Sequence, residues 1–103
     1  MGCSGLTGTI PENLFKDCTK MTSANDMFVG CAGLTGSIPE TLFENNTLIS
    51  SFYATFNGCT KLTGNAPALW NRTNALNGTL CFSGCRNLSN YNQIPKAWGG
   101  GGE

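Results

Sequence analysis

The apolar residues of this 103-residue chain recur at a fixed interval. The stretch 3–15 returns as 31–43 with most positions identical, so the offset is 28 residues. A third copy starts at Cys59 and a degenerate fourth at Cys85. Self-similarity at such a period is the signature of a solenoid, in which successive repeats stack. We therefore divide residues 1–98 into a single domain of about 3.5 repeats, followed by a Gly-rich tail or linker; the segments are 3–30, 31–58, 59–84, 85–98 and 99–103.

Each repeat carries two segments that alternate between apolar and small polar residues. Leu-Thr-Gly predicts a short strand, because Leu can point into the core while Gly permits the following turn. Proline after Ile suits the first position of a short helical turn, which would place Leu14 inward. Stacked repeats would then form two narrow parallel sheets joined by short helical turns. We therefore predict an α/β repeat solenoid.

Stacking would align equivalent residues of successive repeats in columns. The spacing in Phe-x-x-Cys puts the ring and the sulfur on the same face of one turn. The predicted structural ladder comprises Cys3, Cys31, Cys59, Cys85, Phe28, Phe56 and Phe82. A second pair of columns comprises Cys18, Asn46 and Thr73, and Phe15, Phe43, Trp70 and Trp98.

The six cysteines allow three interpretations. A disulfide framework suits a secreted protein, but six cysteines can pair in fifteen ways. Four of them recur at predicted core positions, where a free cysteine behaves as a small hydrophobe. A structural metal is the third interpretation, although Cys81 and Cys85 lack a second close pair and the chain has no His. We favour buried thiols.

Composition and charge exclude several classes of partner. Only 12% of residues are charged and the net charge is zero, so nothing points to nucleic acid or an anionic membrane. No apolar run is long enough to span a bilayer. The first repeat begins two residues after Met1, so we expect no signal peptide in this chain. Because neither end resembles a polar cap, we expect a fragment of a longer array, or self-association through uncapped solenoid ends.

The chain lacks the residue patterns of an enzyme. Without His the commonest general base is missing, and the carboxylates are scattered. Glu12 and Glu40 are equivalent positions at the starts of the predicted turns, where a carboxylate complements the helix dipole. No phosphate-binding loop is present. We expect no catalysis, cofactor or metal, and we interpret the four Asn-x-Ser/Thr strings as turns, at Asn45, Asn71, Asn77 and Asn87.

The repeat resembles the BspA-like leucine-rich repeats of bacterial surface proteins. Phe-x-Gly-Cys-x-x-Leu-Thr is matched at 28–35, 56–63 and 82–89, and Ile-Pro-x-x-Leu-Phe at 38–43. Plant-type leucine-rich repeats share Leu-Thr-Gly-x-Ile-Pro, but their longer leucine-rich strand is absent here. The resemblance implies a right-handed leucine-rich-repeat-like coil, extracellular or cell-surface display, no cofactor, and adhesion or protein binding without catalysis.

Exposed aromatic residues are the candidate contacts for a partner. Tyr53 and Tyr91 fall outside the predicted aromatic columns, and Tyr is favoured at binding hot spots. We interpret Trp98 as the column residue of the last repeat. The function predicted is a non-enzymatic module, part of a bacterial surface protein, that binds a protein or glycan on a host or neighbouring cell. The alternatives are a structural spacer or stalk, or part of a phage fibre.

Overall fold

Short turns, rather than helices and strands, make up most of this chain. A computed structural model describes residues 8–102. Its regular elements are three 3₁₀ helices, η1 (Leu69–Asn71), η2 (Tyr91–Gln93) and η3 (Lys96–Trp98). Within 8–102 the β-type pairing consists of isolated parallel bridges, each of which joins two single residues. The predicted α/β repeat solenoid is therefore wrong for the described residues, which contain no α-helix, no strand and no leucine-rich-repeat-like sheet.

Left-handed backbone conformations explain why the second half of each repeat does not form a strand. The φ angle is 58° at Asp26, 54° at Ala54 and 62° at Leu80, although none of these residues is glycine. An extended strand requires negative φ at every residue, so each of these positions interrupts it. Positive φ recurs four residues later in each repeat, at Gly30, Gly58 and Gly84.

The segments after Ile-Pro form four-residue turns instead of α-helical ones. In the first repeat the N–H of Leu14 bonds to the carbonyl of Pro11 at 3.3 Å, and the same turn recurs from Leu42 to Pro39 at 3.1 Å. These segments are short, and a helical nucleus fixes many dihedral angles for few hydrogen bonds. The inward position predicted for Leu14 is also wrong, since its side chain is 45% exposed, whereas Leu42 is 2% exposed.

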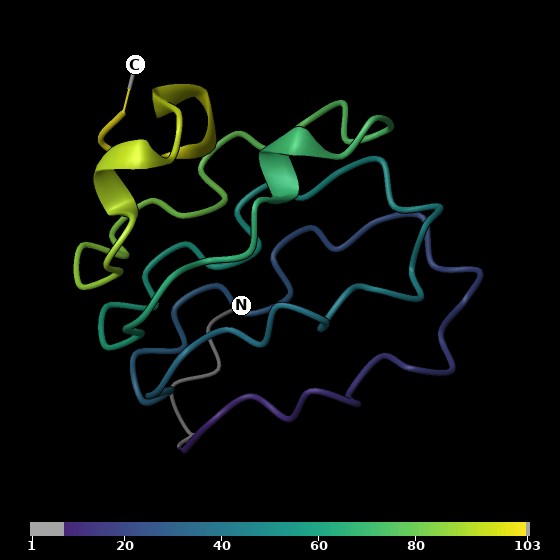
Figure 1. The fold of residues 1–103 in the computed structure, drawn as a ribbon, viewed down its shortest axis with the longest axis horizontal. Helices are drawn as coiled ribbons and strands as arrows, with labels where there is room; N and C mark the ends of the chain where they lie inside the picture. The colour runs from purple at the N-terminus through teal and green to yellow at the C-terminus, as the bar shows by residue number, and fades with distance from the viewer. Residues whose placement is uncertain (1–7, 103) are drawn as a thin grey trace.

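The repeats nevertheless lie against one another in register. We call 22–30, 50–58 and 76–84 row 1, row 2 and row 3. Eight backbone hydrogen bonds of 2.7–2.9 Å run from alternate N–H groups of rows 1 and 2 to carbonyls of the next row. The bond from Phe28 N–H to Thr55 O and that from Phe56 N–H to Cys81 O are examples. Figure 1 shows the successive repeats laid side by side from the purple to the yellow end.

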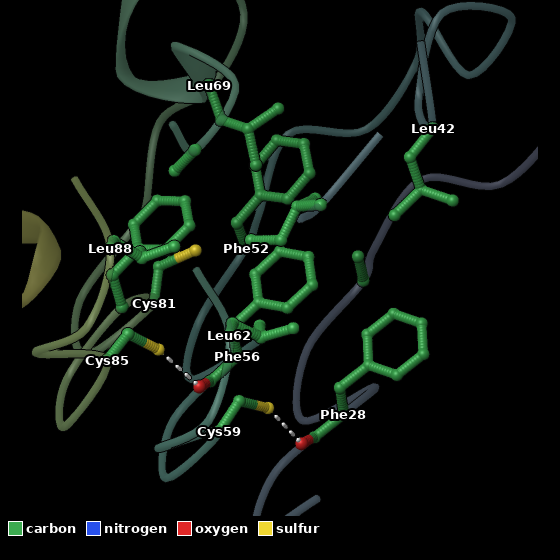
Figure 2. Packing of buried hydrophobic residues seen from close by; sticks show 14 of the residues in the cluster. Phe28, Leu42, Phe52, Phe56, Cys59, Leu62, Leu69, Cys81, Cys85 and Leu88 are labelled. Carbon is green, nitrogen blue, oxygen red and sulfur yellow. Dashed lines mark hydrogen bonds between the residues drawn. The ribbon is translucent and has the colours of Figure 1, made fainter. Parts of the chain in front are cut away.

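The core lies between the turns and contains columns of aromatic rings. Phe28, Phe56 and Phe82 stack with ring centroids 5.3 and 5.5 Å apart and with interplanar angles of 7° and 10°. Phe15 and Phe43 stack in the same way at 5.5 Å. Figure 2 shows Phe28 and Phe56 beside buried cysteine and leucine side chains. Stacking of identical residues follows directly from the register of the rows.

The glycine-rich segment folds back onto the preceding residues. Gly101 N–H bonds to Tyr91 O at 3.0 Å, and Gly102 N–H bonds to Ile94 O at 2.8 Å. A Cβ atom at Gly100 would lie 2.3 Å from Ile94 Cβ, so the segment packs too closely for larger residues. Trp98 O also accepts the N–H of Phe82, which covers part of the open edge of row 3. The packing of 99–102 is therefore specific, unlike that of a flexible linker.

Candidate functional site

Tyr53 lies on an exposed surface that spans all three rows. We define the Tyr53 surface as Asn25, Asp26, Tyr53, Thr79 and Leu80, all of which are exposed. Tyr53 is 37% exposed and Leu80 is 38% exposed. Asp26 N–H bonds to Tyr53 O, and the N–H of the residue after Tyr53 bonds to Thr79 O, both at 2.9 Å. The row register therefore brings an aromatic, an apolar, an acidic and a hydroxyl side chain onto neighbouring rows.

Asn25 holds the backbone beneath Tyr53 in place. Its Oδ1 accepts a hydrogen bond from Ser51 Oγ at 2.6 Å and another from Tyr53 N–H at 3.0 Å. Its own N–H donates to Ser23 Oγ at 3.2 Å. Row 1 and row 2 are thus tied together by side chains as well as by backbone. An aromatic residue on such a support loses little conformational entropy when it binds a partner.

The structure places the other aromatic candidates apart from Tyr53. Tyr91 is half-buried against the core, and its hydroxyl donates to Gly99 O at 3.1 Å. Trp98 is buried, and its ring centroid lies 5.9 Å from that of Phe52. Both residues hold the C-terminal segment against the rows. Tyr91 and Tyr53 are therefore not combined in one site.

Two of the ladder cysteines, which directly follow row 2 and row 3, donate hydrogen bonds to carbonyls of the preceding row. Cys59 Sγ lies 3.0 Å from Phe28 O, and Cys85 Sγ lies 3.0 Å from Phe56 O (Figure 2). Cys31, the preceding ladder residue, is disulfide-bonded. Cys3 lies outside the described residues.

Burial suppresses the reactivity of three of the free thiols. It raises the pKa of Cys59 to about 11 and that of Cys85 to about 12, and it also raises the pKa of Cys81. Because the thiolate is the reactive form, these side chains are poor nucleophiles near neutral pH. Within 8–102, no group of three or more His, Cys, Asp or Glu residues is arranged to hold a metal ion. Cys59, Cys81 and Cys85 therefore serve packing in the described fold.

We expect Cys18 alone among the four free cysteines to react rapidly in the folded protein. Cys18 is exposed, whereas the other three are buried. Titration with an aromatic disulfide reagent should give one fast thiol before unfolding, and Cys18→Ser should remove that fast phase. Two or more fast thiols in the folded protein would show that the buried ladder is open to solvent.

Sequence reasoning missed two side chains that act as hydrogen-bond donors between repeats. Asn46 is fully buried, and its Nδ2 donates to Phe15 O at 3.0 Å and Cys18 O at 2.8 Å. One repeat later, Arg72 donates to the equivalent carbonyls of Phe43 and Asn46. The column predicted from the sequence aligns Asn46 with Thr73. The residue that donates to the equivalent carbonyls is Arg72, one position before Thr73. The signal available in the sequence was that Asn46, a polar residue, takes the position that Cys18 holds in the preceding repeat.

Arg72 shows how a cation is accommodated between the repeats. Its guanidinium carbon lies 5.4 Å from the centroid of the Phe52 ring, within range of a cation–π contact. Partial burial lowers its pKa. The guanidinium therefore makes its contacts within the fold, as hydrogen bonds to two carbonyl oxygens and a cation–π contact with one ring. We therefore assign Arg72 to structure rather than to ligand binding.

A polar hollow of about 200 Å³ lies between the turns of the first two repeats. Its lining comprises Glu12, Asn13, Lys16, Thr41, Leu42, Glu44 and Asn45. Leu42 is its buried residue, and the polar side chains around it are exposed. Glu40, the repeat equivalent of Glu12, does not line the hollow. The titratable side chains that line the hollow, Glu12, Lys16 and Glu44, are therefore all exposed to solvent.

Comparisons with protein-family models, curated protein sequences and solved structures gave no match. Among residues 8–102 there is also no helix with the length and apolarity needed to cross a membrane. The likeness to bacterial surface repeats thus rests on the motifs in the sequence, and the function must be argued from the site.

Proposed function

We propose that this chain is a non-enzymatic recognition module that binds a protein or glycan through the Tyr53 surface. The observation that carries the proposal is the exposure of Tyr53 and Leu80 on consecutive hydrogen-bonded rows. Rigid aromatic side chains supply large contact areas at low entropic cost, which is why Tyr is enriched at hot spots. On the rows next to Tyr53, Asp26 adds a hydrogen-bond acceptor and Thr79 adds a hydroxyl group.

An extracellular or cell-surface location fits this proposal. Disulfides persist in oxidising compartments, and Cys31 is disulfide-bonded. The Phe-x-Gly-Cys-x-x-Leu-Thr motifs resemble those of bacterial surface proteins, for which adhesion is the expected role. The partner would then be a protein or glycan on a host or neighbouring cell.

Replacing Tyr53 with alanine should weaken binding to that partner at least about tenfold, because a central aromatic anchor commonly accounts for more than 1.4 kcal/mol. The measurement is an array of glycans and extracellular-matrix proteins, probed with the full chain and with Tyr53→Ala. Dissociation constants for each positive spot then follow from titration.

Leu14→Ala is the matched control, because Leu14 is also an exposed apolar residue but lies in the turn after Pro11, outside the Tyr53 surface. It should bind like the unsubstituted protein. Equal binding by Tyr53→Ala would place the binding site elsewhere. Failure of the unsubstituted chain to bind any spot would favour the spacer or stalk role.

A further inference from the structure

The backbone brings the ladder cysteines of successive rows close together. Cys59 and Cys85 each directly follow a glycine at which two rows touch. A Cβ atom at Gly84 would lie 3.5 Å from Gly58 Cα, and one at Gly58 would lie 3.4 Å from Gly30 Cα. Hydrogen-bonded parallel segments are about 4.8 Å apart, and disulfides join Cα atoms about 4.4–6.8 Å apart. Equivalent cysteines on adjacent rows therefore fall within disulfide range.

The hydrogen bonds place the thiol of Cys85 beside the backbone of Cys59. Phe56 O accepts both Cys85 Sγ, at 3.0 Å, and Cys59 N–H, at 3.1 Å. The two donors thus converge on one oxygen atom. Cys59 Sγ points in the same direction as Cys85 Sγ, away from Cys85 and toward Phe28 O, as Figure 2 shows. Rotation about the Cα–Cβ bond of Cys59 would turn its sulfur toward Cys85.

This rotation leaves no buried acceptor without a partner. Phe28 O also accepts the N–H of Cys31 at 3.1 Å, so it keeps one hydrogen bond when the Cys59 thiol leaves. Phe56 O likewise keeps the N–H of Cys59 when Cys85 is oxidised. The cost of an unsatisfied buried carbonyl is therefore avoided at both ends.

We propose that Cys59 and Cys85 are a cross-linking site, at which a disulfide joins the third repeat to the segment after it. The bond would occupy the two ladder positions that follow Cys31, which is itself disulfide-bonded. The proposed disulfide cross-links the repeats covalently, and it does not depend on which partner the Tyr53 surface binds.

The oxidant is a small disulfide such as oxidised glutathione. The thiolate of Cys85 attacks one glutathione sulfur, which forms a mixed disulfide and releases one glutathione thiolate. The thiolate of Cys59 then attacks the Cys85 sulfur and releases the second. Two thiols lose two protons and two electrons, and one oxidised glutathione becomes two reduced molecules. Because both thiols are buried, the reaction belongs to refolding rather than to the closed fold.

Cys81 is the competing partner, since it is also buried and lies four residues before Cys85. It occupies the column of Thr55, a residue whose hydroxyl bonds to Ala24 O at 2.9 Å. The ladder column of Cys59 and Cys85 does not include it. A bond between Cys81 and Cys85 would join row 3 to the residue that directly follows it, without cross-linking row 3 to row 2.

The test is refolding of the full, reduced chain in excess oxidised glutathione, followed by alkylation and non-reducing mass spectrometry. A protease that cuts after aromatic residues separates Cys81 from Cys85 at Phe82. The expected product links the Cys59 and Cys85 peptides and leaves Cys18 and Cys81 alkylated. Cys81→Ser should keep this cross-link, whereas Cys85→Ser should lose it.

Alkylation of both Cys59 and Cys85 after oxidative refolding would overturn the proposal. A cross-link from either of them to Cys81, or to any cysteine outside the ladder, would overturn it as well. Persistence of the Cys59 cross-link in Cys85→Ser would show that row contact does not select the partner.

Discussion

Replacing Asn46 with alanine should lower the free energy of unfolding by about 1–3 kcal/mol. Asn46 is fully buried, and its amide donates to the carbonyls of Phe15 and Cys18, which lie in the preceding repeat. Each carbonyl keeps one backbone donor, Cys18 N–H for Phe15 O and Met21 N–H for Cys18 O, so each hydrogen bond that is lost costs about 0.5–1.5 kcal/mol. Asn46→Asp should be worse still, because a buried carboxylate would face two carbonyl oxygens. Urea denaturation followed by circular dichroism measures the change.

The neighbouring Asn45 provides the control for this prediction. Asn45 is exposed, and its amide lies 3.5 Å from Lys16 O, at the limit of a hydrogen bond. Asn45→Ala should therefore change stability by no more than about 0.5 kcal/mol. Equal losses from the two substitutions would mean that the carbonyls of the first repeat do not depend on Asn46.

Alanine at position 78 should destabilise the protein by about 3–5 kcal/mol, because it would expel the Trp98 ring. A Cβ atom there would lie 2.0, 2.1 and 2.4 Å from three atoms of the indole. The position is not in the left-handed region, so the clash alone produces the effect. Loss of a buried Trp side chain from its site typically costs this much. The unfolding midpoint and the tryptophan emission maximum, which should shift to the red, report the change.

A double-mutant cycle separates this clash from a general intolerance of alanine at residue 78. In a Trp98→Ala background the indole is gone, so Gly78→Ala should cost less than about 1 kcal/mol. The coupling arises because Gly78, Phe52 and Ala24 share one inward column, and the small residue leaves room for the ring beside Phe52. A cost independent of Trp98 would contradict the packing described.

The Tyr53 surface could be predicted only in part. Its central residue stands out in the sequence because it interrupts the aromatic columns. Leu80 does not, since it becomes a neighbour of Tyr53 only through the hydrogen bonds between row 2 and row 3. Asn25 likewise gains its role from contacts with Ser51 and Tyr53 across the rows. Such partners are remote in the chain, and no local pattern identifies them.

The sequence by itself determined the period, and with it which residues stand in equivalent positions. Equivalent phenylalanines therefore stack, because rows in register bring identical side chains together. The tertiary structure determined which backbone conformation each segment adopts. Ala54 and Leu80 adopt positive φ, which their residue types disfavour, because hydrogen bonds to adjacent rows and turns outweigh that local preference. Arg72 and Gly78 acquired their roles for the same reason, since their carbonyl and indole partners are distant in sequence and meet them only after the chain has folded.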